Sequence, residues 1–297
     1  MGRLIHSLVF MFLTILCGVV PGADAAEKRL RILVTNDDGF HSEGIRALSE
    51  RLGTFADVLT VAPVNDQSGA SQSTTVLRGE TWVIPHRKGG KLVGYEVEGT
   101  PADAVRFGIM MLGRTQKFDF VVSGINKGGN VGHINLYSGT IGAAMEAMLH
   151  GIPAIAVSQS SRRQDGFSLS AQLAAKAITQ MAHRGAIKNV LLSINVPSGK
   201  VRGIKILPVQ GLVLTVTGFT RQSSDRKRIK YKPVMKFERI QPAGSDSEAY
   251  LQKFVTVTPL NVDRTAYEAL SVLKGWDFSL PGSKKAPSKS TAGPKLP

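Results

Sequence analysis

An alternation of short apolar runs with amphipathic segments constrains the fold more than any other feature of this sequence. The apolar runs have the length of buried strands and occupy residues 30–35, 57–63, 118–126, 152–158 and 189–197. The segments between them place apolar residues at helical spacing or begin with helix-capping residues, and they occupy residues 42–52, 100–112, 139–151 and 168–185. Strands that alternate with helices form parallel sheets with right-handed crossovers. The sequence therefore predicts an α/β fold with a doubly wound, Rossmann-like, mostly parallel sheet.

The pattern of apolar and polar residues changes after Pro197. Segments 201–209, 213–220 and 227–240 mix apolar residues with polar or basic ones, which is typical of strands in hairpins that are not buried on both faces. We predict a basic β-hairpin arm over about 198–250 that packs on a partner subunit, with an ordinary edge hairpin as the alternative. A strand and a terminal helix follow, and the predicted main domain is 26–281. Residues 282–297 are poor in core-forming side chains and predict a disordered basic tail.

The N-terminal residues 1–25 have the three parts of a secretory signal peptide. Arg3 precedes an apolar run from Leu8 to Val20, and small residues up to Ala25 supply a cleavage site. This run is short against the roughly 20 apolar residues of a membrane-spanning helix, so we favour a cleaved signal over a membrane anchor. The expected location is the periplasm or the medium. The single cysteine, Cys17, lies inside the signal, so the mature chain would have no thiol chemistry.

The net charge of +15 is concentrated in the last part of the chain. Residues 184–297 contain 20 Lys and Arg against 7 Asp and Glu. Such a basic region attracts nucleic acid, anionic membranes or small anionic substrates. The sequence has no aromatic interleaving and no helix-turn-helix signal, which argues against nucleic acid as the partner.

Three unusual loops follow predicted strands, where an open parallel sheet binds its ligands. The first contains the adjacent carboxylates Asp37 and Asp38, which repel each other unless a cation compensates them. Oxygen donors without Cys or paired His indicate a hard ion, Mg²⁺ or Mn²⁺ before Ca²⁺. On this motif alone, a turn with a capping aspartate is an equal alternative. The glycines of loops 62–74 and 123–140, and a helix that begins after Ser138, favour a phosphate beside the cation. Neither a Walker A loop nor a G-x-S-x-G elbow is present.

In their order, "TNDDG", "NDQSGAS" and "SGINKGGNVG" resemble the SurE survival protein family of metal-dependent 5'/3'-nucleotidases and acid phosphatases. The resemblance spans about Arg29 to Leu273. It implies hydrolysis of nucleoside 5'- and 3'-monophosphates, catalysis by Asp37 and Asp38, one divalent cation per subunit, and a homodimer or homotetramer. It also implies that the cation is held by Asp37, Asp38, Ser68 and Asn126. The neighbours that would line the phosphate pocket are Asn36, Gly69, Ser71, Asn130, Ser138, Gly139 and Thr140.

Several positions depart from the family pattern. Asn261 stands where typical members carry a histidine, and Lys127 and His133 also differ from the usual residues. If that histidine assists proton transfer, its replacement slows turnover. These departures motivate the alternative of a periplasmic nucleotide- or polyanion-binding protein with little or no turnover. For the proton of the attacking water, Asp38 and His41 are both candidate acceptors.

Overall fold

The computed structural model describes residues 29–211 and 213–280. The predicted signal peptide and the predicted C-terminal tail lie outside the described residues. Within the part that is described, no helix is both long and apolar enough to cross a membrane.

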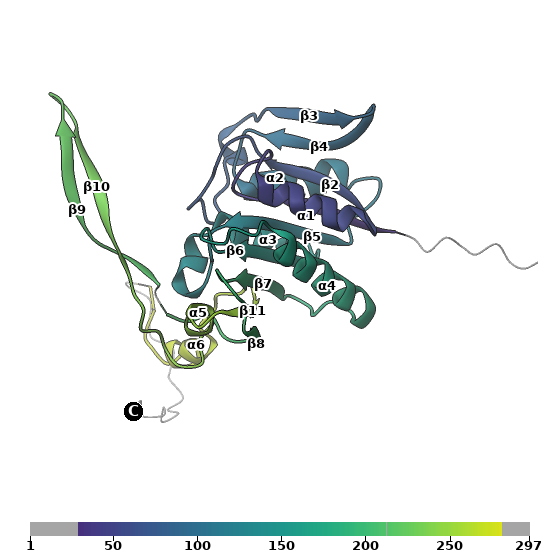
Figure 1. The fold of residues 1–297 in the computed structure, drawn as a ribbon. Coiled ribbons are helices and arrows are strands. Elements are labelled where there is room, and N and C mark those ends of the chain that lie inside the picture. Colours follow the sequence, from purple (N-terminus) through teal and green to yellow (C-terminus); the bar gives the residue numbers. More distant parts are fainter. Residues whose placement is uncertain (1–28, 212, 281–297) are drawn as a thin grey trace, which may run out of the picture.

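The core of the protein is one sheet of nine strands, in the order β3-β4-β2-β1-β5-β6-β7-β11-β8 (Figure 1). Its central strands are mutually parallel and correspond to the five predicted apolar runs. They are β1 (Leu30–Thr35), β2 (Ala56–Pro63), β5 (Phe120–Lys127), β6 (Ala154–Gln159) and β7 (Leu191–Val196).

Helices cover both faces of this sheet, because alternate residues of each buried strand point to opposite sides. Ile32 and Val34 of β1 pack with α1 (Glu43–Gly53) and α4 (Ser168–Arg184), whereas Leu33 packs on the other face. That second face is covered by α2 (Pro101–Phe107) and α3 (Gly139–Leu149). The predicted doubly wound architecture is confirmed.

The sheet extends beyond the predicted strands at both edges. On one side, the hairpin of β3 (Val83–Lys88) and β4 (Lys91–Val97) pairs with β2, and the sequence analysis did not anticipate it. On the other side, β11 (Phe254–Leu260) runs antiparallel to β7, and β8 (Gly203–Ile206) pairs with β11. The remaining helices are η1 (Val76–Arg78), η2 (Gly108–Leu112), η3 (Gly132–Tyr137), α5 (Asp246–Leu251) and α6 (Tyr267–Leu273).

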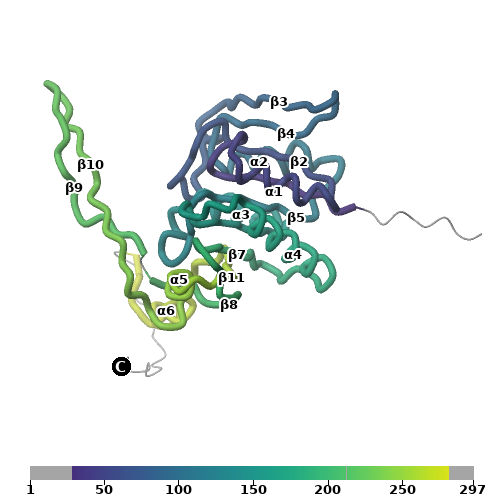
Figure 2. The backbone as a smooth tube through the Cα atoms, in the orientation of Figure 1, coloured from purple at the N-terminus to yellow at the C-terminus, as the bar shows by residue number. Residues whose placement is uncertain are grey.

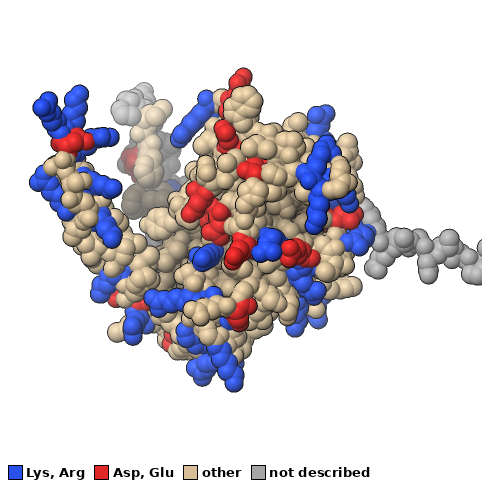
Figure 3. Space-filling model, turned by 45° about the horizontal axis from the view of Figure 1, so that its top comes forward, with Lys and Arg blue, Asp and Glu red and all other residues tan. Residues whose placement is uncertain are grey.

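A two-stranded antiparallel arm projects away from the body (Figures 1 and 2). It consists of β9 (Leu214–Ser224) and β10 (Ile229–Phe237), and every residue of β10 is exposed. The arm is shorter than the predicted 198–250, because β8 belongs to the main sheet and α5 packs on β11. Lys and Arg side chains gather along it (Figure 3).

Candidate metal and phosphate site

Three loops meet at one edge of the sheet. Strand β1 lies between β2 and β5 and is parallel to both, so all three carboxyl ends point the same way. The backbone links the loops as well, since the Gln67 amide donates to the Asp37 carbonyl over 2.8 Å. The first two predicted loops are therefore neighbours in space, as the topology of a parallel sheet requires.

Asp37 is the most deeply buried carboxylate of this edge, at 3% exposure. Its Oδ1 accepts a hydrogen bond from the Thr140 hydroxyl over 2.6 Å. Burial raises the pKa of Asp37 from 3.8 to about 6, the Thr140 hydroxyl and amide oppose this rise, and the charge of Asp38 adds to it. Asp37 is thus a buried acid, and the hydrogen bonds that it accepts do not offset the cost of burying its ionised form.

Asp38 lies closer to solvent and joins the first loop to the third. Its Oδ2 accepts from the Lys127 backbone amide over 3.0 Å. Burial raises the pKa of Asp38, the amide and charge of Lys127 lower it, and the nearby charge of Asp66 raises it. In the second loop, Asp66 Oδ1 accepts from the backbone amide and the hydroxyl of Ser68 over 2.8 and 2.7 Å. Asp66 therefore bonds Ser68 and acts on Asp38 through its charge, and the sequence analysis missed this residue.

Asn126 completes the proposed ligand set from the end of β5. It is buried at 8% exposure, and its Nδ2 donates to the Gly128 carbonyl over 2.8 Å. Because the amide nitrogen makes this bond, the amide oxygen of Asn126 is the atom that can bind a cation. The ladder between β5 and β6 is irregular between Ser123 and Asn126, which is the kind of bulge that redirects a side chain near a site.

Asn36 shapes the turn of the first loop. Its Nδ2 donates to the Gly39 carbonyl over 2.9 Å and to the Ser42 hydroxyl over 2.7 Å, and Gly39 has a positive φ of 93°. Its buried Oδ1 has no hydrogen-bond partner. A buried acceptor without a donor is costly, so this oxygen also suits a ligand at the edge.

A chain of buried polar side chains reaches Asp37 from the other end of the site. The Asn130 amide nitrogen donates to the Ser158 hydroxyl over 2.8 Å and to the Thr140 hydroxyl over 3.3 Å, and Thr140 donates to Asp37. The Asn130 backbone amide donates to Asn195 Oδ1 over 2.7 Å. Asn130 and Thr140 thus hold Asp37 in place. The sequence analysis missed Ser158 and Asn195, which lie on β6 and β7.

The N-terminus of α3 lies directly against Asp37. Ser138 caps the helix by accepting the Ile141 amide on its hydroxyl over 3.1 Å. A Cβ added to Gly139 would lie 2.8 Å from Asp37 Cβ and 3.0 Å from its Oδ2, so only glycine fits there without displacement. The positive end of the helix dipole therefore faces this edge, as anion binding requires.

The second loop is fastened to the third. The Ser71 hydroxyl donates to the Leu136 carbonyl over 2.8 Å, and its amide donates to the Tyr137 carbonyl. Ser71 has a positive φ of 54°, whereas Gly69, at 82°, adopts this conformation without strain. Gly142 of α3 packs so closely on Ser71 that a Cβ would lie 2.1 Å from the Ser71 carbonyl oxygen. In the structure Ser71 joins loops, and its predicted phosphate contact stays a prediction.

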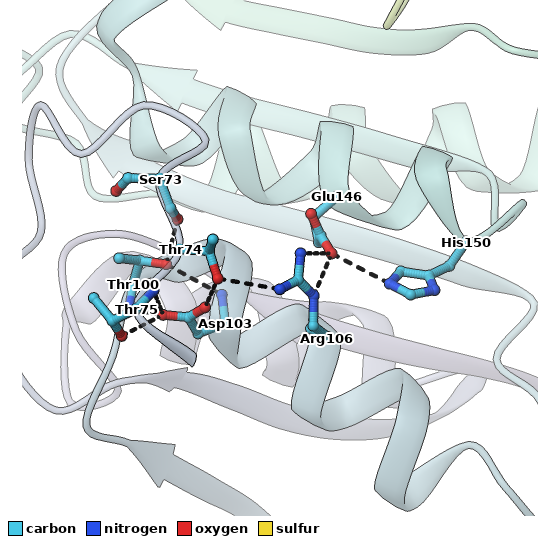
Figure 4. A network of polar contacts seen from close by, with 8 residues as sticks. All are labelled: Ser73, Thr74, Thr75, Thr100, Asp103, Arg106, Glu146 and His150. Carbon is cyan, nitrogen blue, oxygen red and sulfur yellow. Dashed lines mark hydrogen bonds and ion pairs between the residues drawn. The ribbon is translucent and has the colours of Figure 1, made fainter. Parts of the chain in front are cut away.

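Polar residues behind the second loop fix its far end (Figure 4). Burial acts to raise the pKa of Asp103 at the start of α2, but hydrogen bonds from Thr74, Thr75 and the Thr100 amide together outweigh it and lower the pKa to about 2. Arg106 continues the network to Thr74 and to the buried Glu146 of α3, 2.8 Å away. The loop that carries Ser68 is therefore held by both helices of this face.

Two further residues bear on how this site works. Asn261 follows β11, whose Leu260 pairs with Leu191 at the start of antiparallel β7. Because Leu191 is at the amino end of its strand, Asn261 lies at the edge of the sheet opposite Asp38 within this subunit. His41 points to Glu96 of β4, with 2.8 Å between His41 Nε2 and Glu96 Oε1.

The donor set fits a hard divalent cation. Asp37, Asp38 and Asp66 gather at one edge, and none of them forms an ion pair with Lys, Arg or His among residues 29–211 and 213–280. Burial raises the pKa of both Asp37 and Asp38, and the negative charges of Asp38 and Asp66 add to these rises. The ligands that such an arrangement offers are oxygen atoms, which Mg²⁺ and Mn²⁺ prefer.

Comparisons with known proteins find one family repeatedly. The model of the family described as "Survival protein SurE" matches residues 32–223. A protein named 5'-nucleotidase SurE from Geobacter metallireducens is 36% identical over 264 residues, covering 84% of this chain and 98% of the relative. Another of that name, from Syntrophus aciditrophicus, is 37% identical over 250 residues, covering 82% and 93%.

The fold has a solved counterpart. The crystal structure of the SurE protein from Aquifex aeolicus superimposes with a TM-score of 0.71 at 32% identity, and the match covers 82% of this chain and 98% of that one. The matches extend over most of this chain and nearly all of each relative. The chain therefore belongs to the SurE family.

Proposed function

We propose that this chain hydrolyses nucleoside 5'-monophosphates, and 3'-monophosphates as well, with one Mg²⁺ or Mn²⁺ ion per subunit. The observation that carries this proposal is the gathering of Asp37, Asp38 and Asp66 beside Asn126 without a compensating basic ion pair. The 5'-nucleotidase names of the relatives support a nucleotide substrate. They also favour an enzyme over a nucleotide- or polyanion-binding protein with little turnover.

We assign the cation to Asp37, Asp38, Ser68 and Asn126. A bound divalent cation polarises phosphoryl oxygens and lowers the pKa of water. The N-terminus of α3 would orient the phosphate, since its dipole end lies against Asp37. Asn130 and Ser138 act as positioning residues, because their side chains hold Thr140 and the first turn of α3.

Asp38 is the better candidate to accept the proton of the attacking water. His41, the other candidate, has its Nε2 on Glu96 Oε1, on the far side of β2 from β5. Asp38 lies at the edge itself, where only its Oδ2 is engaged by the Lys127 amide. Lys127 adds positive charge beside this carboxylate and would contribute to binding the anionic substrate.

We also propose that the subunits assemble through the arm into a homodimer or homotetramer. Phe219 and Phe237 on the arm are each 67% exposed, and large apolar side chains gathered on a projecting hairpin are typical of a subunit contact. Export by the predicted signal peptide would place the enzyme in the periplasm or the medium.

The test is phosphate release from a panel of 5'- and 3'-nucleotides, with Mg²⁺, with Mn²⁺ and with a chelator. We expect release only with metal, and we expect Asp38→Asn to abolish it while the protein stays folded. Asp57→Asn is the matched control, because Asp57 is exposed at the opposite end of β2. Full activity of Asp38→Asn would refute the metal assignment. Calorimetric nucleotide binding without any phosphate release would favour the binding protein.

A further inference from the structure

A second cluster of metal-binding side chains lies beside the first site. His41 comes from the loop before α1, His86 from β3 and Glu96 from β4, and one ligand atom of each lies within 4.8 Å of the others. In the described part of the chain, no other group of three His, Cys, Asp or Glu residues meets this criterion. Both histidines approach the same atom, Glu96 Oε1, with Nε2 distances of 2.8 Å for His41 and 2.5 Å for His86.

The fold builds this cluster from two elements. On the β3–β4 hairpin, His86 pairs with Gly94, two residues before Glu96, so His86 and Glu96 share a face. Gly94 has no side chain, and Phe40 fills the space above it, since a Cβ there would lie 2.9 Å from Phe40 Cε2. The Phe40 ring stacks on His86 with 4.4 Å between ring centroids, which brings the adjacent His41 over the hairpin.

The contacts within the cluster suit a set of metal ligands better than a hydrogen-bonded triad. His86 Nε2 is buried and has no hydrogen bond of acceptable geometry, although it lies 2.5 Å from Glu96 Oε1. The Glu96 side chain is only 9% exposed, whereas that of His41 is 73% exposed. A buried carboxylate and a buried ring nitrogen therefore converge, with an exposed third donor at the solvent side.

We propose that His41, His86 and Glu96 form a second metal site that binds Zn²⁺ with three protein ligands and an open fourth position. Two imidazoles and a carboxylate are a set that zinc prefers, whereas Mg²⁺ and Mn²⁺ prefer oxygen donors. At Zn–N distances of about 2.0–2.1 Å, tetrahedral ligand atoms lie about 3.3 Å apart. The two contacts that His41 Nε2 and His86 Nε2 make with Glu96 Oε1 therefore need to lengthen by less than about 1 Å. The exposed His41 side chain has the freedom to do so.

The second site is distinct from the first. Glu96 pairs with Ala62 on β2, and β2 separates β4 from β1, which places Glu96 two strand spacings, about 10 Å, from the strand of Asp38. The zinc ion would tie the loop that leaves Asp38 to the β3–β4 hairpin. The proposal does not rest on the nucleotidase activity, because its ligands belong to neither the phosphate pocket nor the oxygen donor set.

The test measures Zn²⁺ binding by competition with a chromophoric chelator. We use full-length Asp37→Asn/Asp38→Asn protein, in which the first site lacks its carboxylates. We expect one Zn²⁺ per chain, and a visible absorption band typical of four-coordinate Co²⁺ when that ion is substituted. His86→Ala and Glu96→Gln should each lower the affinity at least about 100-fold, since even outer-shell changes cost about 10–100-fold. His183→Gln, an exposed histidine of α4, is the matched control and should bind zinc unchanged.

The Glu96→Gln variant keeps the test decisive if His86→Ala fails to fold, because glutamine preserves the size of the side chain. Circular dichroism with chelator verifies that each variant is folded before titration. Zinc binding that is absent in the starting protein, or unchanged in folded Glu96→Gln, would overturn the second site. An octahedral Co²⁺ spectrum would overturn the proposed coordination.

Discussion

Replacing Asp37 by asparagine should stabilise the metal-free protein at neutral pH. Burial raises the pKa of this carboxyl from 3.8 to about 6 in the folded state. A raised folded-state pKa means that the folded protein holds its proton more tightly than the unfolded chain does. The associated stability is fully present below about pH 3.8 and is lost as the pH rises through about 6. At neutral pH the ionised Asp37 therefore destabilises the fold, and asparagine, which is uncharged, does not.

The magnitude follows from the shift. About two pKa units correspond to about 3 kcal/mol at about pH 7.5, and to about 1 kcal/mol at about pH 4.5, where much of the penalty is already relieved. The amide nitrogen of the introduced asparagine needs an acceptor that the carboxylate oxygen did not, which offsets part of the gain. We expect the Asp37→Asn variant to gain about 1–3 kcal/mol at about pH 7.5, or a rise in Tm of about 2–10 °C. The gain should be smaller at the lower pH.

The assay is urea and thermal unfolding at both pH values with chelator present, with Glu80→Gln as the control for loss of an exposed carboxylate. Added Mn²⁺ should then cancel or reverse the difference, since wild type gains about 2.7 kcal/mol at a metal concentration 100 times Kd and the variant does not. A gain equal at both pH values, or a loss of stability at neutral pH with chelator, would refute the reasoning. It would mean that the fold compensates the charge of Asp37 without a cation.

Three further changes probe the support of the site. Gly139→Ala should lower phosphate release at least about tenfold, because its Cβ would clash with Asp37, and moving Asp37 aside would cost about 1 kcal/mol or more of strain; normal kcat would contradict this. Asp103→Asn should cost about 1–3 kcal/mol in urea unfolding above about pH 4, since four donor groups lose a charged acceptor. The lowered pKa of Asp103 stabilises the fold at pH values above the pKa of the unfolded chain. Phe219→Ser/Phe237→Ser should reduce the mass measured by light scattering to that of a monomer, and an unchanged mass would remove the arm from the subunit contact.

The central sheet was predictable because its pattern is local. Runs such as 118–126 are mostly apolar, as is typical of a strand that is buried on both faces. The structure buries seven consecutive residues of β5. The helices carry their own boundary signals, such as the capping box between Thr100 and Asp103. Side chains at strand ends could be grouped because parallel topology brings carboxyl ends together. These features need no knowledge of tertiary contacts.

The residues that support the site were not predictable in the same way. Ser158 and Asn195 lie in buried strands, where a small polar residue resembles ordinary core packing, and only the fold shows that they hold Asn130. Asp66 looks like a turn residue of the second loop, and its effect on Asp38 depends on the distance between two loops. The β3–β4 hairpin carries a Gly-Gly turn signal at Gly89 and Gly90, which the sequence analysis passed over. With the hairpin, the partners of His41 were missed as well.

The positions of Asn261 and His41 in the fold bear on whether the departures from the family pattern slow turnover. The replacement of a histidine at Asn261 suggested slower turnover, but within one subunit Asn261 lies at the amino end of the parallel strands, opposite Asp38. A side chain there can influence the reaction only if a neighbouring subunit receives it or if it acts through the fold. His41 is the histidine that the topology places close to the aspartate pair, and it is bound to Glu96 rather than free. In the proposed mechanism, catalysis depends on Asp38 and the cation ligands, and the slower turnover inferred from Asn261 has no support in the geometry of a single subunit.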